Sequence, residues 1–257
     1  MLLLLSVIRF DDKATRTDRR LEDKMSAFRE IWNIFIGLCQ SLYSVGSVIC
    51  IDEQLLPFRG KSGFRQHVPK KPSKYGIIIW MMCDCATKYI MNAKVYLGKE
   101  NNEVARELVS DVVCTLVQSV SSQDRGGRNV TSYNFFISVD LANKLKNKKL
   151  TLVGKMKQNQ REIPQELKPA RQRGEKSSIF EFTKDLTLVS YVPKKNKSVV
   201  LLSSLHHDSV ICSDPGTPEI IEFYNKIKGA VDILDQPCAS CTVQRATRRW
   251  TMAIFMA

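Results

Sequence analysis

Three aspartates have the type and placement that metal-dependent phosphoryl transfer requires. Asp84 follows the continuous apolar run at residues 76–83, which is typical of a central strand covered on both faces. A carboxylate there is held on a rigid element, at an edge where α/β sheets place their sites. Asp232 and Asp235 are three residues apart in a predicted helix, so they share one face. Together these residues could begin a two-metal centre, in which ions about 4 Å apart activate the attacking oxygen and stabilise the leaving one.

The same spacing also fits a structural role. An aspartate after a strand can end it in a turn, and two aspartates on one helix face can simply be solvated. Spacing alone leaves both interpretations open.

The elements around these residues predict an α/β sheet. The predicted order is a strand (76–83), a polar turn (85–88), a strand (89–97), a helix (103–120), a strand (129–136), a helix (138–146) and a strand (150–153). The handedness of crossover connections would place the later strands parallel to the first. This order matches the ribonuclease H-like plan, a mixed sheet with helices on its faces.

The flanking segments differ in character. Residues 15–43 carry apolar side chains in a 3.6-residue rhythm and predict a helix, whereas residues 48–73 are basic and interrupted by proline and glycine, which predicts loop or short strand. Short β-rich runs between 156 and 218 suggest an insertion. A last helix is expected at 219–235, and the chain then stops within an apolar run, which indicates a truncated product.

The charge of the chain favours a polyanionic partner. It has 39 basic and 26 acidic residues, a net charge of +13. Residues 141–200 alone hold 15 Lys and Arg against 5 Asp and Glu, which is +10. A solvated surface explains a mild excess, but a block of this size is typical of nucleic-acid binding.

Cysteines and the first residues point away from zinc and membranes. Most of the eight cysteines lie in apolar runs, as buried thiols do in a reducing compartment. Cys238 and Cys241 form a lone CxxC, and one pair does not fill a tetrahedral zinc site. The apolar start of the chain is too short to span a membrane, so we expect cytosol or nucleus.

Many short motifs, in order along the chain, resemble the piggyBac transposase family. They include IDEQLLPFRG at 51–60, PSKYGI at 72–77, WMMCD at 80–84, RNVT at 128–131, NFF at 134–136, REIP at 161–164 and RRW at 248–250. The resemblance covers nearly the whole chain. It implies a cut-and-paste DNA transposase with a ribonuclease H-like core and an aspartate triad that binds Mg²⁺.

The family's site residues map onto this sequence one by one. The resemblance places the first triad aspartate at Asp84 and the third at Asp232, and Asp235 matches another acidic residue linked to activity. Ala230 stands where the family usually has a second glycine. The resemblance further implies double-stranded DNA with TTAA-type ends as the partner and a nuclear location. It is also compatible with a homodimer. The residues expected to contact DNA are Arg59, Lys61, Lys155, Lys157, Arg161, Arg248 and Arg249.

The second triad position departs from the family pattern. The family has Thr-x-Asp-Asn-Phe-Phe, and this chain has Tyr133 in place of the aspartate. A phenol is neutral near pH 7, since its reference pKa is about 10, and its ring stands where a short carboxylate should reach the metal. Asn134 offers a neutral oxygen but points to the other side of a strand. We therefore expect weakened Mg²⁺ binding and impaired catalysis.

The resemblance divides the chain into five units. They are a partial helical DNA-binding and dimerisation region (1–75), the first part of the ribonuclease H-like core (76–155), a basic β-rich insertion (156–218), the closing helix of the core (219–241) and the start of a second DNA-binding and dimerisation segment (242–257). Three functions remain open: a DNA-binding protein that has lost cleavage, a host protein-interaction module on the same scaffold, or an active transposase with an altered site.

Overall fold

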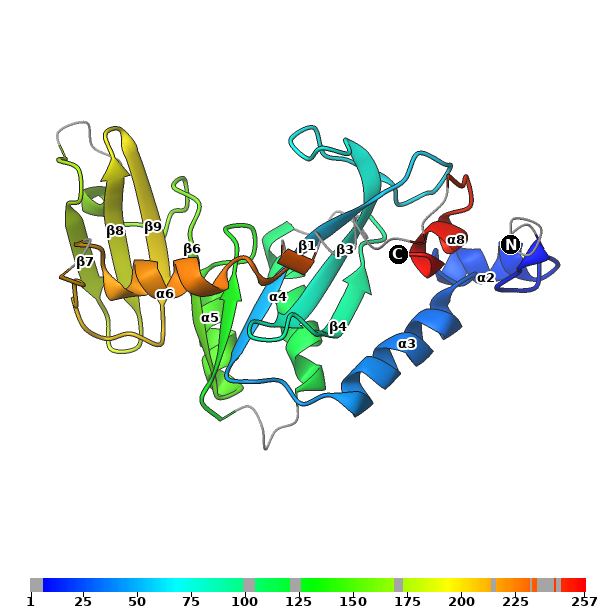
Figure 1. Cartoon of the computed structure of the whole chain (residues 1–257), viewed down its shortest axis with the longest axis horizontal. Coiled ribbons are helices and arrows are strands. Elements are labelled where there is room, and N and C mark those ends of the chain that lie inside the picture. Colours follow the sequence, from blue (N-terminus) through cyan, green and yellow to red (C-terminus); the bar gives the residue numbers. More distant parts are fainter. Residues whose placement is uncertain are drawn as a thin grey trace.

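One mixed sheet forms the centre of the molecule (Figure 1). The computed structural model describes residues 7–98, 105–120, 126–168, 173–213, 216–231, 233–234, 243 and 246–257. The nine strands in these residues follow the order β2-β3-β1-β5-β6-β9-β8-β7, and β4 also pairs with β3. The strands are β1 (Val48–Pro57), β2 (Gln66–His67), β3 (Tyr75–Asp84), β4 (Ile90–Val95), β5 (Arg128–Ser132), β6 (Leu150–Lys155), β7 (Ser178–Phe182), β8 (Thr187–Lys194) and β9 (Lys197–Ser203).

Strand β1 corrects the expectation of loop or short strand for residues 48–73. It is ten residues long and lies in the middle of the sheet, between β3 and β5. The sheet therefore begins at Val48 and not at residue 76. Ile49 and Ile51 are fully buried on one face of β1, and Cys50 is fully buried on the other.

Strand directions differ from the expectation in one respect. The hairpin of β3 and β4 is antiparallel as predicted, but β5 and β6 are parallel to β1 and not to β3. Because β1 and β3 are antiparallel, β4 runs in the same direction as β5. The crossover that the handedness rule describes thus starts from β4 and passes through α4 (Ala105–Leu116).

Helices cover both faces of the sheet. Helices α4 and α5 (Val139–Asn147) cover the face that presents Ile49, Ile51 and Val130. Helices α3 (Arg29–Leu42) and α8 (Trp250–Phe255) cover the opposite face of β1, β3 and β4. On that same face, α6 (Glu219–Ile227) packs against β6, β8 and β9.

The region expected to be an insertion extends the sheet. Strands β7, β8 and β9 pair antiparallel to one another, and β9 pairs with the end of β6. Figure 1 shows them with α6 at one end of an elongated molecule. The helix expected at 219–235 is described as α6 up to Ile227, followed by turns and a further helical stretch.

The predicted helix at 15–43 is two helices. Helix α2 (Arg16–Glu22) ends before Asp23, and α3 begins at Arg29. The Asp23 carboxylate binds the Arg29 guanidinium at 2.8 Å and accepts the Met25 N–H at 2.8 Å, so it holds the chain in a turn between the helices. Residues near both ends of the chain meet here, since the rings of Phe10 and Phe255 lie 5.2 Å apart (Figure 1).

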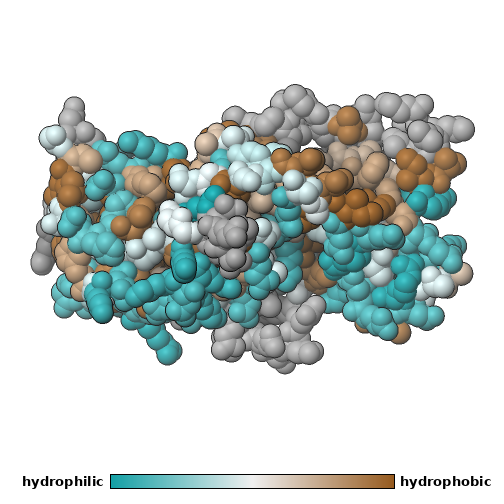
Figure 2. Space-filling view, turned by 90° about the horizontal axis from the view of Figure 1, so that it is seen from below, coloured by the Kyte–Doolittle hydropathy of each residue, from teal (hydrophilic) through white to brown (hydrophobic). Residues whose placement is uncertain are grey.

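Helix α3 is apolar on two sides. Trp32 and Ile36 are buried against the sheet, whereas Phe35, Leu38 and Leu42 are exposed. Figure 2 shows hydrophobic residues gathered right of centre, on the side of the molecule where α3 lies. The residues described include no helix that is long and apolar enough to cross a membrane.

A glycine in β6 tests how tightly the sheet and its covering loop are packed. A Cβ added at Gly154 would lie 2.6 Å from the Ser132 carbonyl oxygen and would overlap Ile137. We expect Gly154→Ala to destabilise the fold by about 1–3 kcal/mol, because buried backbone and side chain must both shift. Gly37→Ala in α3 is the control: a Cβ there meets nothing within 4 Å, so it should stabilise by roughly 0.5–1 kcal/mol. Urea unfolding of both variants measures this, and equal effects would contradict the packing described.

Candidate functional site

A strip of polar residues separates two apolar clusters on the face covered by α3, α6 and α8. On this face β1 and β3 carry one cluster and β6, β8 and β9 carry the other, while β5 between them presents Asn129 and Thr131. Both side chains are buried and bonded, with Thr131 Oγ1 donating to Asn129 Oδ1 at 2.8 Å and Asn129 Nδ2 donating to Thr151 Oγ1 at 3.0 Å. Buried polar side chains between two apolar clusters interrupt the hydrophobic packing, and they require hydrogen-bond partners to be stable there.

Beyond Asn129 and Thr131, the polar strip continues to three residues whose side chains could bind a ligand or take part in catalysis. Ile51, Ser132 and Gly154 are paired across β1, β5 and β6. One residue further on come Asp52 in β1, Lys155 at the end of β6 and Tyr133 just after β5. Because alternate residues of a strand share a face, Asp52 and Lys155 project to the same side as Cys50 and Val153. Tyr133 faces that side too, since its ring contacts Tyr224 of α6.

Asp52 is a buried carboxylate on this face, with 8% of its surface exposed. Its Oδ1 accepts the Glu53 N–H at 2.8 Å. The hydrogen bond with Cys85 and burial raise the pKa of the Cys50 thiol, and the nearby Asp52 carboxylate raises that pKa further. Cys50 and Asp52 are therefore neighbours on one side of β1.

The chain that follows α6 passes over the same place. The thiol of Cys50 donates to the Lys228 carbonyl and that of Cys85 to the Ile227 carbonyl, both at 3.7 Å. Val231 is fully buried in the cluster that contains Cys50. Asp232 and Asp235, predicted as the third triad residue and its acidic neighbour, lie outside the described residues; the chain on either side of Asp232 is held on the Asp52 side of the sheet.

Tyr133 begins a turn and does not continue the strand to 136 as expected. Strand β5 ends at Ser132, and the Tyr133 carbonyl accepts the Phe136 N–H at 3.0 Å. The Tyr133 ring meets the ring of Tyr224 on α6 edge to face, with centroids 6.3 Å apart. The phenol ring thus lies between the end of β5 and α6.

Asp84 lies elsewhere and has a structural role. It pairs with Ile49, three residues before Asp52 on β1, and strand alternation assigns it to the opposite face. Its carboxylate accepts the N–H groups of Gly46 at 2.6 Å, Ala86 at 2.7 Å and Thr87 at 3.0 Å. Burial by itself would raise the pKa of Asp84, but these backbone hydrogen bonds outweigh it and lower the pKa below the usual range.

The acidic residue beside Tyr133 is therefore Asp52 and not Asp84. The sequence contained a signal for it, since residues 48–51 are apolar and mostly β-branched and Asp52 follows them directly. The expectation of Asp84 as the first triad aspartate came from the family resemblance, and the interpretation of residues 48–73 as loop or short strand gave no reason to consider Asp52 beside it.

The described donor set does not fit a divalent metal. Asp52 is an anion, but Tyr133 is a phenol and Lys155 an ammonium group, whereas Mg²⁺ requires several oxygen ligands in near-octahedral geometry. The described residues contain no group of three or more His, Cys, Asp or Glu that could hold a metal ion. Cys238 and Cys241 lie outside them.

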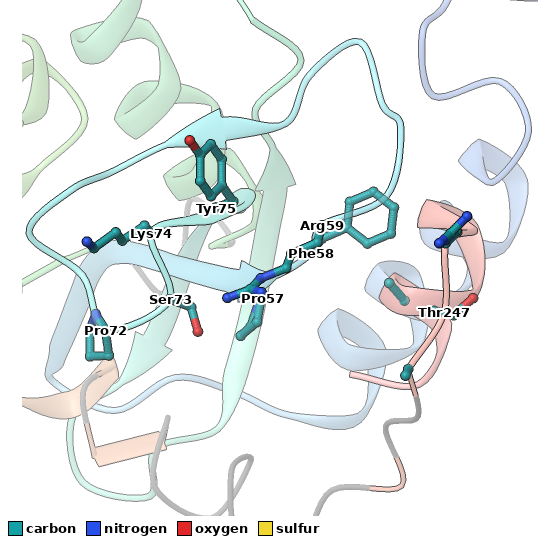
Figure 3. A pocket seen from close by; sticks show the side chains of 11 residues that line it. Pro57, Phe58, Arg59, Pro72, Ser73, Lys74, Tyr75 and Thr247 are labelled. Carbon is teal, nitrogen blue, oxygen red and sulfur yellow. The ribbon is translucent and has the colours of Figure 1, made fainter.

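A second set of predicted residues forms a basic cavity at the far end of β1. The cavity, about 580 Å³, is lined by Arg59 after β1, Lys74 and Tyr75 at the start of β3, and Arg248 before α8. Figure 3 shows Arg59 and Lys74 on neighbouring segments, with Thr247 across from them. Arg65 braces the loop by donating to the carbonyls of Arg59 and Gly60 at 3.0 Å.

The other predicted DNA contacts are spread over the surface. Lys61 lines a further cavity with Arg16, Arg20 and Lys24. Lys157 is exposed with its ammonium 4.9 Å from the Phe135 ring centroid, and Arg161 is exposed nearby. Arg249 differs, because its guanidinium donates to the Ile8 carbonyl at 2.6 Å and joins the two ends of the chain.

Comparison with known proteins gives the class of the fold. A family model described as Transposase IS4 matches residues 2–257. A cryo-EM structure of piggyBac transposase synaptic complex with hairpin DNA matches with a TM-score of 0.91 and 45% identity, over 99% of this chain and 53% of that chain. The mixed sheet with its helices is the ribonuclease H-like fold of a transposase, as the sequence predicted.

Two curated human proteins show the same relationship. The PiggyBac transposable element-derived protein 3 of Homo sapiens is 22% identical over 244 residues, covering 89% of this chain and 41% of that protein. The Chimeric ERCC6-PGBD3 protein of Homo sapiens is 22% identical over 244 residues, covering 89% of this chain and 23% of that protein. The chain spans about half or less of the length of these relatives. It belongs to the Transposase IS4 family, among its piggyBac-type members, which confirms the resemblance.

The structural role of Asp84 has a measurable consequence. Asp84→Ala leaves three backbone N–H groups without their acceptor, and we expect a loss of roughly 2–4 kcal/mol in the free energy of unfolding. The exposed Asp208 provides the matched control, and Asp208→Ala should change stability by less than about 0.5 kcal/mol. Equal stability of the two variants would contradict this role.

The pH dependence of that loss follows from the lowered pKa. A carboxyl group whose pKa is lower in the folded state stabilises the fold above its unfolded pKa of about 3.9, and this contribution is lost as pH falls through the folded pKa. The stability difference between wild type and Asp84→Ala should therefore be full at pH 7 and shrink below pH ~4. Urea unfolding across this range measures it.

Proposed function

We propose that this chain is a DNA-binding member of the piggyBac-type transposases that no longer cuts DNA. The observation that carries the proposal is Tyr133 in line with Asp52, on the face over which the chain leading to Asp232 passes. The proposed site is Asp52, Tyr133 as the altered second position, and Asp232 with Asp235. Asp52 replaces Asp84 as the proposed first acidic residue.

Loss of cleavage follows from charge and shape. Two divalent cations need several carboxylates, and Tyr133 contributes none near pH 7. Lys155 lines the same cavity as Tyr133 and adds a positive charge, which disfavours a cation there. Loss of a residue that hydrogen-bonds to a metal ligand lowers metal affinity or activity by roughly 10–100-fold, and loss of a direct ligand should lower it further. Mg²⁺ remains the proposed ancestral cofactor, with weakened binding.

Retained DNA binding rests on the basic surface. The cavity at Arg59, Lys74 and Arg248 and the excess of +10 in residues 141–200 both suit a phosphate backbone. The piggyBac transposase in the matching cryo-EM structure is in a synaptic complex with hairpin DNA. For this chain we propose duplex DNA as the partner, with TTAA-type ends and a nuclear location as the corresponding expectations.

Cleavage assays test the loss of activity. With Mg²⁺ and a duplex that carries a TTAA-type end, the wild-type chain should give no nicking. Tyr133→Asp restores a carboxylate in line with Asp52 and should increase Mg²⁺ affinity by about tenfold or more. Wild-type nicking that disappears in Asp52→Asn would refute the proposal, whereas Tyr133→Phe controls for removal of the hydroxyl alone.

Salt dependence tests DNA binding. Each phosphate contact that is lost should reduce the slope of log K against log salt by about 0.9. We expect this reduction for Arg59→Ala and for Lys74→Ala, and none for Lys94→Ala, whose side chain is exposed on β4. Fluorescence anisotropy with a labelled duplex at several salt concentrations measures the slopes. Affinity that does not respond to salt would contradict a phosphate-contacting surface.

A further inference from the structure

A cavity of about 640 Å³ opens between α6 and the ends of β5 and β6. It is lined by residues from these elements and from β8 and β9, and it takes in Tyr133 at the altered triad position. Polar side chains in the lining include those of Tyr133, Asn134, Lys155, Tyr224, Asn225 and Lys228. No Asp or Glu belongs to the described lining of this cavity. A binding site with ammonium groups and no carboxylate is suited to an anion.

Two lysines supply the positive charge from different elements. Lys155, the last residue of β6, lines the cavity together with Tyr133. Lys228, at the end of α6, donates to Asn225 Oδ1 at 2.7 Å, and its Nζ lies 5.6 Å from the Tyr224 ring centroid. Both of these contacts of Lys228 are to neutral groups. They orient the ammonium without cancelling its charge.

Neutral donors surround the two ammonium groups. The amides of Asn134 and Asn225 carry N–H groups, and the phenols of Tyr133 and Tyr224 carry O–H groups. Phosphate oxygens accept charge-assisted hydrogen bonds from such a mixture of cations and neutral donors. The tyrosine rings also provide apolar faces on which a sugar or base can rest.

We propose that this cavity binds a phosphate group of a DNA strand directly, without a divalent metal. The inference rests on the proposed function in one respect, namely that Tyr133 has weakened the metal centre. With an aspartate at 133 the cavity would carry a carboxylate, which repels a phosphate unless a metal ion stands between them. With Tyr133 that carboxylate is missing from the described lining, and Lys155 and Lys228 supply positive charge in place of the cations.

Other occupants agree less well with the lining. A divalent cation would be repelled by two ammonium groups and would find only neutral oxygens among the described lining side chains. An apolar ligand would strip water from the lysines without replacing it. The phosphate ester is the chemistry that uses both the charges and the donors.

Titration of phosphate in the presence of EDTA tests this inference. The probes are inorganic phosphate and a 5′-phosphorylated dinucleotide. Their binding is measured by ³¹P NMR and by calorimetry. We expect saturable binding by the wild-type chain without Mg²⁺, weakened about 10- to 100-fold by Lys155→Met and by Lys228→Met, which keep the side-chain stem. Lys226→Met is the matched control, because Lys226 is exposed on the same helix and does not line the cavity.

A charge variant sharpens the test. Tyr133→Asp should weaken phosphate binding in EDTA, and added Mg²⁺ should restore it. Tyr133→Phe should keep binding within a few-fold of wild type, because it adds no charge. Thermal unfolding of every variant separates lost binding from lost fold, and Lys155→Gln, which also removes the charge, replaces Lys155→Met if the latter does not fold.

The outcomes distinguish this inference from the proposed function. Phosphate binding that requires Mg²⁺ in the wild-type chain, or that Lys226→Met weakens as much as Lys155→Met, overturns the inference. Duplex binding that persists while phosphate does not bind the wild-type chain overturns the inference alone. Absence of duplex binding, with phosphate still bound in EDTA, overturns the proposed function and supports the cavity as a phosphate site.

Discussion

The parallel register of β1, β5 and β6 is the constraint on which the site depends. Hydrogen bonding fixes Ile51, Ser132 and Gly154 side by side, so Asp52 and Lys155 project to one face and Tyr133 follows directly at the end of β5. A slip of β1 or β6 by one residue would turn Asp52 or Lys155 to the opposite side. Gly154 helps to fix this register, because Ile137 and the Ser132 carbonyl lie too close to it to admit a Cβ.

That register gives the polar strip its chemical character. The apolar clusters under α3 and α8 and under α6 stop on either side of β5, and the strip between them is buried and hydrogen-bonded through Asn129 and Thr131. Beyond Asn129 and Thr131 the strip continues to the carboxylate of Asp52, the phenol of Tyr133 and the ammonium group of Lys155. In the proposed account, a phenol in place of a carboxylate at this point favours an anion over a cation as the ligand.

Local patterns in the sequence predicted much of the fold. The apolar run before Asp84, the hairpin after it, and the helix that Ser138 caps by accepting the Leu141 N–H all follow from periodicity and turn chemistry. Strand β1 was missed because proline, glycine and basic residues after Leu56 resemble a loop. Its membership of the sheet depends on pairing with β3 and β5, which are distant in sequence, and no local pattern reports such pairing.

The choice between Asp52 and Asp84 shows the same limit in the site. Both follow apolar, strand-like residues, and both belong to motifs that resemble the family. Only the register and the three backbone donors around Asp84 separate a residue of the site from a residue that holds a turn. Tyr133 was recognisable from the sequence as a departure, but its neighbours Lys155 and Tyr224 were not, since they come from other elements.

Metal binding by the unaltered chain tests the central claim most directly. Mn²⁺, which can replace Mg²⁺ and is visible by electron paramagnetic resonance, can be titrated into the wild-type protein and into Asp52→Asn with and without duplex DNA. We predict only weak Mn²⁺ binding without a stoichiometric site in the wild-type protein, and closely similar titration curves for both proteins. A stoichiometric Mn²⁺ site in the wild-type protein that is lost in Asp52→Asn would contradict the loss of the metal centre.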